Sequence, residues 1–162
     1  MLIGVPGSGK STWIQNKNFD ETTTCILSTD NYIEDAAKIL GKTYTEIFEE
    51  TIADATADMN VQASWAVKNS MNIVWDQTNI NKKTRAKKLA MIPANDYERI
   101  AIFFETPDAE EHQRRLNSRE GKIIPEHVMR NMINGLEFPE KSEGFDRIVT
   151  IPKDENGVIK IG

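Results

Sequence analysis

The sequence of 162 residues contains one cysteine, two histidines and only 7% aromatic residues. A single cysteine excludes an internal disulfide and a multi-cysteine zinc site, and its place in the apolar run Cys25-Ile26-Leu27 favours a packing role. No stretch reaches the ~20 apolar residues that cross a bilayer. The opening Met1-Leu2-Ile3-Gly4 lacks the basic segment and long apolar run of a signal peptide. We therefore expect a cytoplasmic protein (host cytoplasm if it is viral) without a membrane partner.

Basic residues are fewer than acidic ones: 20 Lys and Arg against 25 Asp and Glu give a formal charge of −5. A broad basic surface for duplex DNA is not expected, because neutralising phosphates needs clustered Lys and Arg. The local run Lys82-Lys83-Thr84-Arg85-Ala86-Lys87-Lys88 is basic. It fits either a nucleic acid contact or a solvated helix face. The hydrophobic content of 39%, without repeats or linkers, predicts one globular domain over residues 1–162.

Short apolar runs alternate with segments of helical periodicity, the pattern of parallel strands joined by helices. The predicted strands are Leu2–Val5, Cys25–Ser28, Asn72–Trp75, Arg99–Phe104 and Arg147–Ile151. The predicted helices are about Gly9–Lys17, Asn31–Leu40, Thr45–Asn69, Lys82–Met91, Asp108–Arg119 and Glu126–Leu136. An α/β fold with a mostly parallel sheet follows. Asn156-Gly157, between two β-forming runs, predicts a C-terminal β-hairpin.

The run Gly4-Val5-Pro6-Gly7-Ser8-Gly9-Lys10-Ser11 matches G-x-x-x-x-G-K-[ST] at every fixed position, between a strand and a helix. Glycine allows the torsions and the close approach that let successive N–H groups surround an oxyanion at the positive end of the helix. Lys10 is expected to reach the β- and γ-phosphates of ATP, and the Ser11 hydroxyl to ligate Mg²⁺. The predicted nucleotide contacts are Gly4, Pro6, Gly7, Ser8, Gly9, Lys10, Ser11 and Thr12.

Two aspartates follow predicted strands, at the carboxyl ends where α/β sheets bind ligands. Phosphoryl transfer needs a carboxylate that accepts the proton of the acceptor hydroxyl and another that holds Mg²⁺. We assign Asp30 as this base and Asp76 as a ligand of metal or substrate, with a helix N-cap as the alternative for each. Thr78 and Asn79 fit contacts to substrate oxygens and simple turn formation equally well.

Arg115 and Arg119 lie four residues apart in the predicted helix Asp108–Arg119, so they share a face. The polar run Glu120-Gly121-Lys122 and a further helix follow, which makes residues 108–125 a predicted lid. Guanidinium groups delivered by a closing lid can neutralise charge on the transferred phosphoryl group. Both arginines are therefore predicted to be catalytic and to contact the nucleotide. A basic helix end without chemistry is the alternative.

Both histidines and Arg114 suggest no chemistry of their own. His112 and His127 have no partner at metal-ligand spacing, and we expect both on helix surfaces. Arg114 falls off the face shared by Arg115 and Arg119 and is expected at the surface as well.

Taken in order, these motifs resemble the P-loop kinases typified by the phage polynucleotide 5′-hydroxyl kinases. The residues that carry the resemblance are Gly4–Ser11 with Thr12-Trp13, Ser28-Thr29-Asp30-Asn31-Tyr32, Asp76-Gln77-Thr78-Asn79, Arg115…Arg119 with Ile123-Ile124-Pro125, and Glu143-Gly144-Phe145-Asp146. The resemblance spans nearly the whole chain and concerns the kinase domain alone. The first motif is shared by many NTPases, whereas the ordered set is more specific.

The resemblance implies a three-layer α/β sandwich with a five-stranded, mostly parallel sheet and a small helical lid. It also implies ATP·Mg²⁺ as the phosphoryl donor and a hydroxyl as the acceptor. Asp30 matches the general base of the family, and Asp76 the aspartate of its D-x-T-N element. One departure concerns substrate binding: where these kinases carry an arginine that grips the substrate phosphate, three residues after the base, this chain has Ile33.

Three functions therefore stay open at this stage. The first is an ATP-dependent kinase of 5′-hydroxyl ends of DNA or RNA. The second is a kinase with another acceptor, such as a nucleoside, a modified DNA base, an aminoacylated RNA or a small metabolite. The third is a nucleotide-dependent switch, in which hydrolysis drives a change of shape. Transfer of phosphate to an acceptor other than water separates the kinases from the switch.

Overall fold

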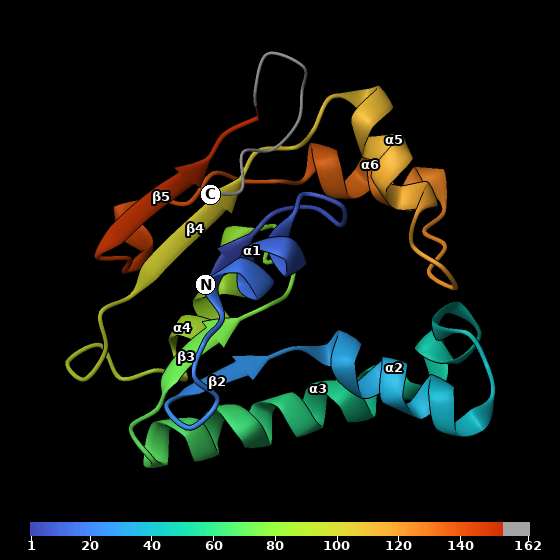
Figure 1. The fold of residues 1–162 in the computed structure, drawn as a ribbon. Helices are drawn as coiled ribbons and strands as arrows, with labels where there is room; N and C mark the ends of the chain where they lie inside the picture. Colours follow the sequence, from blue (N-terminus) through green and yellow to red (C-terminus); the bar gives the residue numbers. More distant parts are fainter. Residues whose placement is uncertain (154–162) are drawn as a thin grey trace. The chain divides into compact units, whose positions relative to one another are not determined.

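The computed structural model describes residues 1–153, so the predicted hairpin around Asn156-Gly157 lies outside the described residues. The strands are β1 (Leu2–Ile3), β2 (Thr24–Leu27), β3 (Asn72–Trp75), β4 (Ile100–Phe104) and β5 (Arg147–Ile151). The helices are α1 (Lys10–Lys17), α2 (Thr29–Leu40), α3 (Tyr44–Lys68), α4 (Lys82–Leu89), α5 (Ala109–Asn117), α6 (Glu126–Asn134) and the short 3₁₀ helix η1 (Lys141–Glu143) (Figure 1). The predicted strands and helices are confirmed, with ends that move by at most two residues.

The chain divides into two compact units. The first, here called the phosphate-loop unit, consists of Met1–Phe19, Thr78–Ser118 and the described residues from Ile124 onward. The second, here called the Asp30 unit, consists of Asp20–Gln77 and Arg119–Ile123.

In the phosphate-loop unit, β4 is the central strand of a parallel ladder in the order β1-β4-β5 (Figure 1). Leu2 pairs with Ile102, and Ile100 pairs with Arg147. Beneath this ladder a core forms around Ile3, Leu89, Ala101 and Phe145. The predicted run Ile100–Phe104 is apolar at every position because both faces of a central parallel strand are covered.

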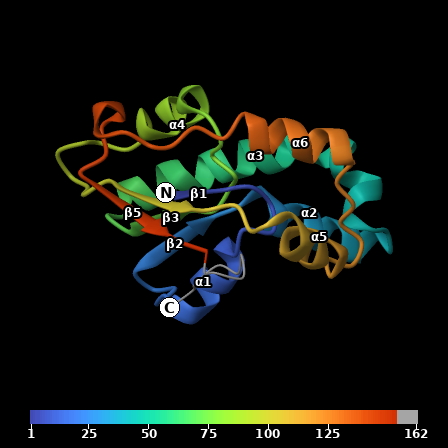
Figure 2. The same cartoon turned by 90° about the horizontal axis from the view of Figure 1, so that it is seen from above.

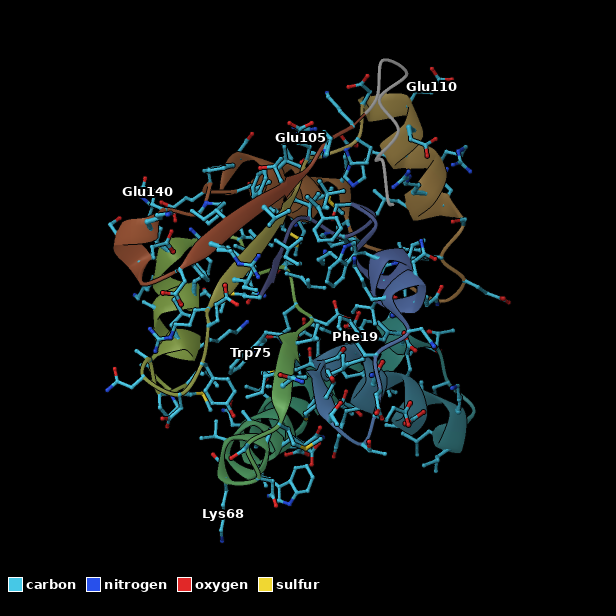
Figure 3. All side chains as sticks on the ribbon, turned by 60° about the vertical axis from the view of Figure 1, so that its left-hand side comes forward. Phe19, Lys68, Trp75, Glu105, Glu110 and Glu140 are labelled. Carbon is cyan, nitrogen blue, oxygen red and sulfur yellow. The ribbon has the colours of Figure 1, made fainter. Side chains whose placement is uncertain are left out.

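In the Asp30 unit, β2 and β3 form a parallel pair in which Thr24 lies opposite Asn72. Helix α3 packs on both strands and on α2, as Figure 2 shows from above. The core between α2 and α3 consists of Ile33, Ala37, Ile47 and Ala55. Trp75, labelled in Figure 3 at the end of β3, is 2% exposed.

The strand pairing confirms an α/β fold with parallel strands but differs from the single five-stranded sheet expected above. The described strands form one ladder of three and one of two. Strand β1 has only two residues, so few of its backbone groups can pair with a neighbouring strand. The amide of the next residue, Gly4, donates to the carbonyl of Thr78 at 2.9 Å. Within residues 1–153, no helix combines the length and the apolar character needed to cross a membrane.

Candidate functional site

The predicted phosphate loop follows β1 and leads into α1 within the phosphate-loop unit. Gly7 and Gly9 have φ angles of +81° and +99°, in the left-handed region that glycine tolerates. A Cβ atom on Gly4 would lie 2.6 Å from Ser8 Oγ and 3.1 Å from Phe104 Cβ. The loop, here called the phosphate cradle, is thus tightly turned and leaves no room for a side chain at Gly4, as expected of a loop whose backbone N–H groups surround a phosphate.

Lys10 has its ammonium group inside this loop. Its Nζ donates to the carbonyls of Gly4 and Val5 at 2.7 and 2.9 Å, and the side chain is buried. Ser11 and Thr12 are exposed in the first turn of α1, and no side chain caps that helix. Because the first amides of a helix lack intrahelical partners, this uncapped end suits an anion. The loop residues therefore fit a bound nucleoside triphosphate.

Helix α5 packs against the loop through a histidine. His112 is only 5% exposed, and its Nε2 lies 2.7 Å from the carbonyl oxygen of Pro6. A Cβ on Gly7 would lie 3.1 Å from the ring of His112 and 3.3 Å from Leu116. The prediction that His112 lies on a helix surface is therefore wrong. Its spacing of four residues from Leu116 is the signal that could have placed it on the buried face.

Arg115 also reaches the loop. Its Nη1 donates weakly to the Gly7 carbonyl at 3.4 Å, while its Nε donates to Glu111 at 2.6 Å. Hydrogen bonds from Arg114 and Arg115 lower the pKa of Glu111 to about 2, so this carboxylate stays charged and holds both guanidinium groups. Arg114 is exposed, as predicted. One of the two predicted lid arginines thus lies beside the phosphate cradle.

Arg119 follows the end of helix α5. Helix α5 ends at Asn117, so Arg119 is not on the helix face of Arg115, and it belongs to the Asp30 unit. Directly after the helix, the Ser118 hydroxyl donates to the carbonyl of Arg115 at 2.8 Å. The expectation of paired arginines on one helix is therefore wrong, whereas the role of each in catalysis stays a prediction.

In the Asp30 unit, Asp30 is the second residue of α2, whose N-cap is Ser28. Its carboxylate is 45% exposed. Oδ1 accepts a hydrogen bond from the Tyr44 hydroxyl at 2.7 Å, and Oδ2 lies 3.4 Å from Lys122 Nζ. Asp30 is therefore not an N-cap. Its carboxylate is held by Tyr44 and Lys122 and remains accessible to solvent.

Lys122 joins two carboxylates of α2, because it also forms an ion pair with Glu34. Its Nζ lies 4.6 Å from the centre of the Tyr44 ring. Beside this group is a hollow of about 340 Å³ whose lining includes Glu34, Tyr44 and Lys122. The departure at Ile33 is explained by packing: Ile33 is 0% exposed in the α2–α3 core, where an arginine would bury an unpaired charge.

The residues after β3 divide between the units. Asp76 continues the β2–β3 pairing, with its amide donating to Leu27 at 2.8 Å, and no helix begins there, so it is not an N-cap. Thr78 contributes its carbonyl to the Gly4 amide. Asn79 is 1% exposed, its Nδ2 donates to the Leu2 carbonyl at 2.6 Å, and Lys88 donates to its Oδ1. The amide of Asn79 is thus used inside the phosphate-loop unit, and its predicted contact with substrate stays untested.

The predicted metal ligands fit Mg²⁺ by donor type. Within the described residues, no group of three or more His, Cys, Asp or Glu side chains forms a ready-made metal site. Mg²⁺ is commonly held by one or two protein oxygens together with substrate phosphates, so a hydroxyl such as Ser11 and a carboxylate such as Asp76 suffice. Both assignments stay predictions.

The basic run of α4 is divided between the interior and the surface. Arg85 is 0% exposed and forms a bidentate ion pair with Glu143, at 2.7 and 3.0 Å. It also donates to the carbonyls of Asn79, Ile80 and Glu137. Lys82 pairs with Glu140. Arg85 therefore lies in the interior of the phosphate-loop unit, whereas Lys83 and Lys87 of the same run are exposed, as on a solvated helix face.

Two curated relatives of low identity align with most of this chain. The heterogeneous nuclear ribonucleoprotein U-like protein 2 of Mus musculus is 23% identical over 157 residues, covering 91% of this chain and 20% of that protein. The Homo sapiens protein of the same name is 22% identical with the same coverage. The chain thus spans about a fifth of the length of these curated relatives.

A family model described as an AAA domain matches residues 1–139 of the 162. The matched stretch includes the phosphate loop, Asp30, Asp76 and both predicted lid arginines. The α/β fold with parallel strands agrees with this P-loop, kinase-like class. On the strength of this match, the chain belongs to the AAA domain family of P-loop nucleotide-binding proteins.

Proposed function

We propose that this chain is an ATP- and Mg²⁺-dependent kinase that transfers the γ-phosphoryl group to a hydroxyl, most readily the 5′-hydroxyl of a polynucleotide end. The observation that carries the proposal is the carboxylate of Asp30, which is half-exposed and is held in place by a hydrogen bond from Tyr44. It occurs in a chain that has a complete phosphate loop. A kinase requires such a base, because the attacking hydroxyl must lose its proton. A switch that hydrolyses its nucleotide also needs a proton acceptor, for the attacking water, so transfer to an acceptor other than water is what separates the two functions.

The reaction assigns one task to each residue. The loop amides and Lys10 bind the β- and γ-phosphates, and Arg115 and Arg119 neutralise charge on the transferred group. The acceptor oxygen forms a bond to the γ-phosphorus while the bond to the β,γ-bridging oxygen breaks, and ADP leaves. The proton of the acceptor hydroxyl goes to Asp30. Mg²⁺, held by Ser11 and Asp76 together with the phosphates, supplies further charge neutralisation when bound.

Two observations bear on the acceptor. The curated relatives are named as ribonucleoproteins, which supports a nucleic acid as the acceptor class. Against a long polynucleotide stands the burial of Arg85, which removes the centre of the basic run from the surface. A nucleoside, a modified base, an aminoacylated RNA or a small metabolite is therefore the second candidate class. Asp76 and Thr78 are proposed to contact whichever acceptor binds, whereas the Asn79 side chain is buried and its amide is engaged by Leu2 and Lys88.

The decisive experiment offers γ-³²P-labelled ATP and a panel of acceptors to the wild-type chain. The panel holds 5′-hydroxyl DNA, 5′-hydroxyl RNA, modified-base DNA and free nucleosides. We expect labelled 5′ ends, and an excess of 5′-hydroxyl oligonucleotide should suppress any labelling of a nucleoside acceptor. Labelling of nucleosides alone would select the second class, and release of phosphate to water alone would select the switch.

Two variants link the activity to the site. Lys10→Ala should abolish ATP-dependent transfer, and Asp30→Asn should retain ATP binding but lose transfer. The matched controls are Lys17→Ala in α1 and Asp35→Asn in α2, which remove an exposed charge of the same kind from the same helix. Unchanged transfer by Asp30→Asn would reduce Asp30 to a structural residue. Fractionation of cells that express the chain tests the expected cytoplasmic location.

A further inference from the structure

Tyr44 is a polar residue near the site to which the sequence assigned no role. It is the first residue of α3, and its hydroxyl donates to Asp30 Oδ1 at 2.7 Å, a contact that joins the beginnings of α2 and α3. Burial and the charge of Asp30 raise the pKa of Tyr44 far above its ordinary value. The hydroxyl therefore keeps its proton at every pH at which a kinase works, and it acts toward Asp30 only as a donor.

The two oxygens of Asp30 are held unequally. Oδ1 receives the short hydrogen bond from Tyr44, whereas Oδ2 faces Lys122 Nζ at 3.4 Å. Lys122 is also paired with Glu34, so its charge is shared between two carboxylates. Each oxygen thus accepts one contact and keeps a further lone pair, and Oδ2, whose contact is the longer, is the one that we assign to take a proton.

We propose that Tyr44 is a positioning residue for the transfer reaction: it fixes Oδ1 of Asp30 so that Oδ2 faces the acceptor hydroxyl. This inference rests on the proposed function. In the step it assists, the acceptor O–H bond breaks, its proton moves to Oδ2, and the acceptor oxygen bonds to the γ-phosphorus as ADP leaves. A carboxylate that is held in one rotamer reaches this geometry more often than one that rotates freely.

The tyrosine ring has contacts that do not depend on its hydroxyl. The ring packs on Phe48 with centroids 5.7 Å apart and lies under Lys122. Tyr44→Phe keeps both contacts and removes only the donor to Asp30. The substitution therefore separates a role in positioning from a role in packing.

The test measures transfer from γ-³²P-labelled ATP to a 5′-hydroxyl oligonucleotide under single-turnover conditions. For Tyr44→Phe we expect the rate constant to fall about 10- to 100-fold, the range for loss of a hydrogen bond to a charged group, with the KM for ATP within twofold of wild type. The residual transfer rate of Asp30→Asn, measured over long incubations with excess enzyme, should not fall further on adding Tyr44→Phe, because the group that Tyr44 positions is already disabled. Tyr97→Phe is the matched control, since the Tyr97 hydroxyl lacks a hydrogen-bond partner among the described residues.

The outcomes separate this inference from the proposed function. A wild-type chain that labels no acceptor overturns the proposed function, and the role of Tyr44 in transfer falls with it. A wild-type chain that transfers phosphate while Tyr44→Phe transfers it equally fast overturns the positioning role alone. The double variant could also have a rate constant reduced by the product of the two single reductions. That result overturns the positioning role as well, because Tyr44 would then act independently of Asp30.

Discussion

Gly4 is the single residue on which the shape of the phosphate cradle depends most directly. A Cβ there would meet Ser8 Oγ at 2.6 Å and Phe104 Cβ at 3.1 Å, and the latter belongs to the rigid central strand β4. Gly4→Ala should therefore displace the loop and abolish binding of a fluorescent ATP analogue. Gly41→Ala is the control: at φ +64° with open space around it, alanine should cost about 1 kcal/mol of stability and leave nucleotide binding unchanged. Normal binding by Gly4→Ala would show that the cradle tolerates a side chain.

Glu111 gives a residue-scale prediction about pH. Its pKa is lowered from 4.5 to about 2 in the folded chain, so its contribution to stability is complete above about pH 4.5 and is lost as the pH falls toward 2. Glu111→Gln should lower the free energy of unfolding at pH 7, and the difference from wild type should shrink between pH 4.5 and 2. Urea denaturation at pH 7, 5 and 3 measures this difference. Glu110→Gln, which alters the exposed neighbour labelled in Figure 3, should show no such trend.

At the scale of single elements, the sequence predicted most of the secondary structure because the periodic signals are local. Asn72–Trp75 and Arg147–Ile151 are strands with the predicted bounds. The end of α5 lies two residues before the predicted one, because periodicity indicates that a helix exists more sharply than where it ends. Asp30 was expected before a helix but lies within its first turn, since α2 begins at Thr29.

The roles of buried polar residues were harder to predict than the elements that carry them. Arg85 was counted with its basic neighbours, although its spacing of four from the buried Leu89 placed it on the inward face of α4. Its partner Glu143 is 58 residues away, and no local pattern predicts such a pairing. The contact of Tyr44 with Asp30 was missed for the same reason: it depends on how α2 and α3 pack.

The capping box at the start of α3 allows a prediction for a whole element. Thr43 Oγ1 accepts from the Glu46 amide at 3.3 Å, and the Glu46 carboxylate accepts from the Thr43 amide at 2.6 Å. Thr43→Ala should reduce the free energy of unfolding by about 1 kcal/mol, measured by urea denaturation. Thr56→Ala, in the middle of the same helix, should not destabilise the protein, because alanine favours helix interiors. Equal losses in the two variants would contradict the capping role.

At the scale of the molecule, the residues proposed for one reaction come from two compact units. Lys10, Ser11 and Arg115 belong to the phosphate-loop unit, whereas Asp30 and Arg119 belong to the Asp30 unit. Each unit has a core of its own. The matched family stretch, residues 1–139, includes parts of both, which supports the proposal that they act as one kinase domain.

Binding of ATP should stabilise this molecule by an amount that can be calculated in advance. A ligand that binds only the folded state at 100 times its Kd adds about 2.7 kcal/mol. For a chain of this length each kcal/mol raises the Tm by roughly 2–4 °C, so we expect a rise of about 5–11 °C in differential scanning calorimetry with Mg²⁺ and a non-hydrolysable ATP analogue.

Variants of the two lysines of α1 test whether this rise in Tm comes from binding at the phosphate loop. Lys10→Ala should abolish it, because Lys10 lies inside the cradle, and Lys17→Ala should keep it, because Lys17 is exposed at the far end of the helix. A single transition that moves as a whole indicates that the two units unfold together. Two transitions, of which one moves, assign the nucleotide to the unit that moves. A full rise in Lys10→Ala would place the nucleotide outside the loop and remove the basis of the proposed kinase.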